Sequence, residues 1–95
     1  MKISFTRKEY RALLDMVFVS HWVISAPTNN DTAPAKYEAL REKIYSYAKE
    51  FQCDDFIEYD ESFEKYFETA QLENEGAMNF LNEYEEYVLH NAELF

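Results

Sequence analysis

Glycine is almost absent from this chain, because Gly76 is the single glycine among 95 residues. Tight hairpin turns require residues at positive φ, and phosphate-binding loops require close approach of the backbone; glycine meets both needs at the lowest steric cost. The chain therefore has little turn chemistry for building a sheet, and the P-loop and Rossmann motifs are excluded. We expect an all-α fold.

The amino-terminal helix has the clearest start signal. Thr6 and Glu9 match the capping box S/T-x-x-E, so the helix should begin at Arg7 and end near Ala26, ahead of Pro27. Its apolar residues surround the axis instead of forming one stripe: Tyr10, Leu13, Leu14, Met16, Val17, Phe18, Val19, Trp22, Val23 and Ile24. Such a helix is either central in a bundle or shared with another subunit.

A second helix should follow the polar connector Pro27–Thr32, with Thr32 as its N-cap, and run to about Gln52. Its apolar stripe is ordinary for a helix that packs on a core: Tyr37, Leu40, Ile44, Tyr47, Ala48 and Phe51.

The pattern between Cys53 and Asp60 leaves the next boundary open, since more than one residue there can cap a helix. A third helix over at least Ser62–Gln71 is favoured because apolar residues recur at helical spacing: Phe56, Tyr59, Phe63, Phe67 and Ala70.

Asn74 and Gly76 mark a turn before a fourth helix. The stripe of this helix is Ala77, Leu81, Tyr84 and Val88, flanked by Phe80 and Tyr87. The sequence thus predicts one domain, residues 1–95, folded as a compact antiparallel four-helix bundle. If the helices on either side of Gly76 merge, the prediction becomes a three-helix bundle.

Charge is divided unevenly along the chain. Residues 1–49 contain eight Lys/Arg and five Asp/Glu, whereas residues 50–95 contain one lysine, Lys65, and fourteen Asp/Glu. A surface this acidic repels phosphate and anionic lipid and attracts cationic proteins. We therefore expect a basic protein surface as partner, with no direct binding of nucleic acid and no membrane association.

The candidate partner-binding residues form an acidic strip, which comprises Asp54, Asp55, Glu58, Tyr59, Asp60, Glu61, Glu64 and Glu68. On a helix, Asp60, Glu64 and Glu68 would repel one another at i,i+4 spacing, and only Lys65 relieves this. The alternative is a solvated face that keeps the protein monomeric.

No catalytic, cofactor or metal-binding residues are predicted. The two histidines, His21 and His90, lack the Glu-x-x-His context of di-iron bundles, and His21 is better explained as a hydrogen-bonded core or interface residue. Cys53 is the single cysteine and cannot form an intramolecular disulfide, which fits the cytoplasm. The apolar run Ala12–Ala26 is too short to span a membrane.

The sequence thus favours a non-enzymatic interaction or regulatory module, such as an inhibitor or a nucleic-acid mimic, that presents its acidic half to a basic partner. The alternative is a structural subunit that forms a homodimer through its amino-terminal apolar helix.

Replacing Thr6 by alanine should lower the free energy of unfolding by about 1 kcal/mol, because the side chain that caps the first helical turn is removed. Urea denaturation followed by circular dichroism measures the loss. An unchanged midpoint would mean that this helix starts elsewhere.

Overall fold

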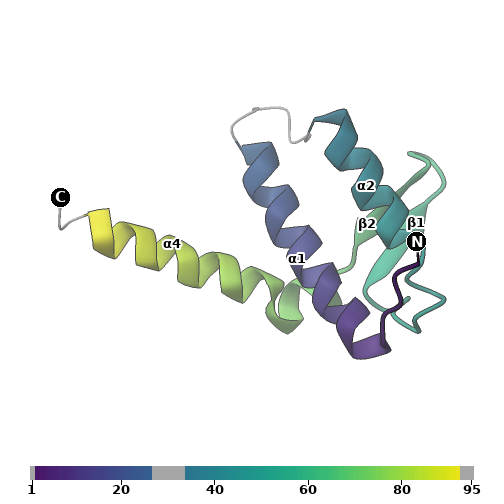
Figure 1. Ribbon diagram of the computed structural model, residues 1–95. Coiled ribbons are helices and arrows are strands. Elements are labelled where there is room, and N and C mark those ends of the chain that lie inside the picture. The colour runs from purple at the N-terminus through teal and green to yellow at the C-terminus, as the bar shows by residue number, and fades with distance from the viewer. Residues whose placement is uncertain (1, 27–33, 93–95) are drawn as a thin grey trace.

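The computed structural model describes residues 2–26 and 34–92. Its elements in chain order are α1 (Arg7–Ser25), α2 (Ala35–Tyr45), β1 (Ile57–Asp60), β2 (Lys65–Glu68), the short helical turns α3 (Ala70–Leu72) and η2 (Glu73–Ala77), and α4 (Met78–Ala92). In Figure 1, α1 and α2 lie side by side, the β1–β2 hairpin lies beside α2, and α4 projects away from the other elements. The expected connector at 27–32 and the Thr32 cap lie outside the described residues.

The capping box at the start of α1 is confirmed. The Glu9 backbone N–H donates to Thr6 Oγ1 at 3.1 Å, and the Thr6 backbone N–H donates to Glu9 Oε1 at 2.8 Å. One face of α1 is buried, through Tyr10, Leu14 and Phe18. The helix is not central in a bundle, because its opposite face is open to solvent.

The second helix is shorter than predicted and buries a different face. It ends at Tyr45, and residues 46–52 form turns instead of continuing to Gln52. Its buried residues are Arg41 and Tyr45, whereas Tyr37 and Leu40 of the predicted stripe are exposed. An arginine was not expected in the core, because its acidic partner lies far along the chain.

The prediction of an all-α four-helix bundle is wrong, because an antiparallel hairpin replaces the third helix. Its register pairs Ile57 with Glu68, Glu58 with Phe67, Tyr59 with Tyr66 and Asp60 with Lys65. Aromatic residues suit strands as well as helices, so their spacing did not distinguish the two.

The hairpin turns without glycine. Asp60 Oδ1 accepts hydrogen bonds from the backbone N–H of Ser62 at 2.8 Å and of Phe63 at 3.3 Å, which is a side-chain-stabilised turn. Glu64 then takes a left-handed conformation with φ of 53°. A helix would have stacked Asp60, Glu64 and Glu68 on one face, whereas the hairpin separates these like charges.

Gly76 separates the last two helical segments, so the three-helix alternative is wrong as well. Its φ is 139°, a value that side chains rarely allow, and Glu75 and Gly76 form a kink within η2, just before α4 begins. The described chain therefore has three helices of 19, 11 and 15 residues and a two-stranded sheet, besides the short turns α3 and η2.

The core lies where α1, the end of α2, the hairpin and η2 meet. Tyr10 stacks on Phe51 with 4.3 Å between ring centroids, and its hydroxyl donates to the Ile44 carbonyl. The buried apolar residues are Tyr10, Leu14, Phe18, Tyr45, Ala48, Cys53, Phe56, Ile57, Leu72, Ala77 and Leu81. Only the first turn of α4 contributes to this core, because residues 82–90 are all exposed.

Truncating Leu14 to alanine should destabilise the protein by roughly 2–4 kcal/mol, because the side chain is fully buried and its removal leaves a cavity. Met16→Ala is the matched control, since this residue of the same helix is largely exposed and its truncation should cost less than 0.5 kcal/mol or so. Chemical denaturation of the two variants measures the difference. Equal losses would contradict the orientation of α1.

Candidate functional site

An ion pair joins α2 to the hairpin. Arg41 Nη2 donates to both carboxylate oxygens of Glu68, at 2.9 and 3.0 Å, and Arg41 Nε donates to Glu68 Oε2 at 3.2 Å. The Tyr45 hydroxyl donates to the same carboxylate at 2.7 Å. Glu68 is therefore held inside the fold by three groups on two residues of α2.

The electrostatics of this cluster follow from its burial. Burial alone lowers the pKa of Arg41, but the attraction of Glu68 and its hydrogen bonds outweigh this effect, so the pKa lies above its ordinary value. Burial, followed by the negative charge of Glu68, raises the pKa of Tyr45. Arg41 therefore stays charged and Tyr45 neutral at physiological pH.

Glu42 adds a second link between α2 and the hairpin. Its carboxylate accepts the backbone N–H of Tyr66 at 3.0 Å and lies 3.2 Å from Arg41 Nη1. The hairpin is thus fixed to α2 by side chains from two successive positions of the helix.

The predicted acidic strip is divided by the structure. Asp54, Asp55, Glu58, Glu61 and Glu64 are exposed, and Tyr59 is about half exposed. Asp60 is engaged in the turn, and Glu68 is bound to Arg41. These last two carboxylates therefore have structural roles within the fold.

The hairpin tip presents an aromatic residue that the sequence analysis placed in a helix. Phe63 is exposed between Glu61 and Glu64, and its ring makes an edge contact with Phe67 at 6.0 Å between centroids. Tyr59 pairs with Tyr66 across the strands at 4.8 Å. The sequence would have predicted Phe63 as an exposed residue of a hairpin tip only if the turn at Asp60 had been recognised.

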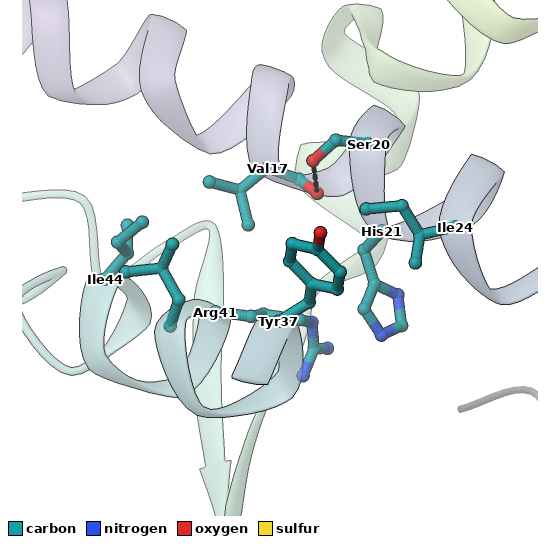
Figure 2. Close-up of a pocket in the computed structure, with 8 residues that line it drawn as sticks. Val17, Ser20, His21, Ile24, Tyr37, Arg41 and Ile44 are labelled. Carbon is teal, nitrogen blue, oxygen red and sulfur yellow. Dashed lines mark hydrogen bonds between the residues drawn. The ribbon is translucent and has the colours of Figure 1, made fainter. Parts of the chain in front are cut away.

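A small pocket lies between α1 and α2 (Figure 2). It has a volume of about 70 Å³ and is lined by Val17, Ser20, His21, Ile24, Tyr37, Leu40, Arg41 and Ile44. Ligand sites usually measure roughly 300–1,000 Å³, so this pocket is too small for a substrate. At its edge His21 Nε2 contacts the Glu38 carboxylate, as expected for a hydrogen-bonded interface histidine.

Cys53 is fully buried in the core. Burial raises the pKa of its thiol, and this effect exceeds the opposing influence of Arg7 and Arg11. These cations were not evident as neighbours in the sequence, because they lie more than forty positions away along the chain. A neutral buried thiol is a poor nucleophile.

Among residues 2–26 and 34–92, no group of three His, Cys, Asp or Glu side chains is placed to hold a metal ion. Glu86 and His90 are both exposed on α4. Within the same residues, no helix combines the length and apolar character that crossing a membrane requires.

Neutralising Glu68 with Gln should destabilise the protein by about 3 kcal/mol, because the buried Arg41 guanidinium loses its charged partner. Glu64→Gln, four residues away on the exposed turn, is the control and should leave stability within roughly 0.5 kcal/mol. Thermal and urea unfolding measure both. A neutral effect of the Glu68 change would show that the ion pair does not anchor the hairpin.

Comparisons of the chain with protein-family models, with curated proteins and with solved structures found no match in any of the three.

Proposed function

We propose that this protein is a non-enzymatic interaction module that binds a basic protein surface through its hairpin end. The contact surface, called here the acidic hairpin surface, consists of Asp54, Asp55, Glu58, Glu61 and Glu64 with the aromatic residues Tyr59 and Phe63. The proposal retains the exposed members of the predicted strip and omits Asp60 and Glu68.

The observation that carries the proposal is that the exposed carboxylates of the hairpin end form no ion pair. In the part of the chain that the structure describes, none of the five exposed carboxylates lies within 4.0 Å of a basic group. Arg7 and Arg11 reach the segment around Asp54 and Asp55, since Arg7 donates to the Gln52 carbonyl and Arg11 lies over the Phe56 ring. Lys65 is the single Lys or Arg between residues 50 and 95. The excess of negative charge at Glu58, Glu61 and Glu64 raises the local potential, which speeds association with a cationic partner.

The hairpin is also held in place, which favours recognition over simple solvation. Arg41 and Glu42 fix β2 to α2, and β1 is held by its pairing with β2, so a partner does not have to order the surface on binding. Phe63 and Tyr59 add aromatic area beside the carboxylates. Aromatic residues are enriched in the centres of protein interfaces, whereas acidic residues are depleted there.

A structural homo-oligomer assembled through α1 is the second candidate. It is favoured by the exposed apolar residues Met16 and Val23 on the face of α1 that points away from the core, and by Trp22, which is 45% exposed beside Phe18. A formal net charge of −10 opposes self-association, so this candidate ranks second.

The test begins with proteins that the immobilised chain captures from host lysate at low salt and releases at high salt. For a purified partner, Glu58→Gln/Glu61→Gln/Glu64→Gln should slow association several-fold and flatten its salt dependence, with a small effect on dissociation.

The matched control is Glu50→Gln/Glu73→Gln/Glu86→Gln, which changes the net charge equally at positions outside the acidic hairpin surface. It should leave the association rate close to that of the unaltered protein. Equal rates for both triple variants would show that only total charge matters, and the acidic hairpin surface would then serve solvation alone.

A further inference from the structure

An apolar stripe that starts at the end of η2 and runs along α4 begins in the core and continues into solvent. Ala77 and Leu81 are buried, and the next residues of the stripe, Tyr84 and Val88, are 60% and 43% exposed. Phe80 and Tyr87 lie beside this stripe and are 54% and 66% exposed. The helix therefore packs through its first turn only, and the same face is bare over the remaining turns (Figure 1).

The outer face of α1 carries a second apolar stripe, formed at i, i+4, i+7 and i+11 by Ala12, Met16, Val19 and Val23. Phe80 of α4 joins this stripe in an open hollow of about 530 Å³, which is lined by Ala12, Asp15, Met16, Val19, Ser20 and Phe80. From α4, Phe80 alone lines this hollow, and Tyr84, Tyr87 and Val88 continue the exposed apolar face of α4 beyond it. Together the two stripes form what we call the α1–α4 surface: Ala12, Met16, Val19, Val23, Phe80, Tyr84, Tyr87 and Val88.

The exposed apolar area of this surface is of the size found at interaction sites. A fully exposed aromatic side chain presents roughly 150–250 Å², so Phe80, Tyr84 and Tyr87, which are 54%, 60% and 66% exposed, together present on the order of 350 Å². Contiguous apolar patches of roughly 300–600 Å² are often functional. The projecting α4 also gives the chain a Cα radius of gyration of 14.9 Å, where a closed domain of this length has about 12 Å.

The charges around the surface indicate the occupant. Helical spacing puts Glu83 on one border of the α4 stripe and Glu85 on the other, and α4 contains no Lys or Arg. On the α1 side, Asp15 adds a carboxylate, which is paired with Arg11 at 2.8 Å. A second copy would bring its own α4 carboxylates against these, whereas a cationic partner would compensate them.

We propose that the α1–α4 surface binds an amphipathic helix of another protein, with its apolar stripe in the cleft between α1 and α4 and Lys or Arg residues facing Glu83 and Glu85. Helix-in-groove recognition of this kind uses apolar anchors at i, i+3, i+4 and i+7. The inference goes beyond the function proposed above, since this surface is separate from the acidic hairpin surface and lies at the other end of the molecule (Figure 1).

The probe is an 18-residue fluorescent peptide of Leu and Lys with Leu at helical i, i+3, i+4 and i+7 positions, and binding is followed by anisotropy. A Leu/Glu peptide with the same Leu pattern and a Leu/Lys peptide with scrambled order are the reference probes. The patterned Leu/Lys peptide should bind at least ten-fold more tightly than either reference.

Phe80→Ser/Tyr84→Ser should weaken this binding at least ten-fold. Both side chains are more than half exposed, so the fold should survive, which circular dichroism checks. Tyr37→Ser/Leu40→Ser is the matched control, because it removes a tyrosine and a second apolar residue that are partly exposed at the α1–α2 pocket and do not line the α1–α4 hollow, and it should leave the affinity unchanged.

Two results would overturn the proposal. The first is equal affinity of the Phe80/Tyr84 and Tyr37/Leu40 variants for the patterned peptide. The second is a protein that sediments as a dimer at micromolar concentration and becomes monomeric on the Phe80/Tyr84 change, since a second copy would then cover the surface. The triple Gln variant of the acidic hairpin surface should bind the peptide normally, so failure of either proposal leaves the other intact.

Discussion

The buried ion pair between Arg41 and Glu68 is the constraint on which the arrangement of this chain depends. A two-stranded hairpin is marginally stable by itself, and this one has only four residues in each strand. Arg41 and Glu42 anchor it to α2, and the anchored hairpin supplies Phe56 and Ile57 to the core. The cost of burying the charges is offset by the multiple hydrogen bonds that Glu68 accepts.

Because the core is completed by the hairpin and η2, little of α4 is needed to close it. The two ends of the molecule consequently differ in chemistry. One end carries exposed carboxylates on an anchored hairpin, and the other carries an exposed apolar face bordered by Glu83 and Glu85. The two proposals above together place two partners, or two regions of one partner, at different ends of the molecule.

Local signals in the sequence predicted local structure, but they did not predict which distant residues come into contact. The capping box at Thr6 located the start of α1, and Gly76 marked the break before α4. The hairpin was missed because Glu64 adopts the positive φ that a glycine usually takes in a turn, and the Asp60 side chain holds that turn by hydrogen bonds. The division of the acidic strip was missed too. Glu68 is distinguished from Glu64 by its ion pair with Arg41, which lies 27 positions earlier in the chain and could not be identified as its partner from local sequence.

Because Cys53 is buried, the single thiol of the protein can serve as a probe of core opening. Alkylating reagents need contact with the thiolate, and here the sulfur has no exposed surface in the folded state. Modification must therefore wait for the core around it to open, and its rate under native conditions reports the fraction of molecules that are open at any moment. The chain thus carries a natural label for the fluctuations of its own core, at the junction of Ala48, Phe51 and the hairpin.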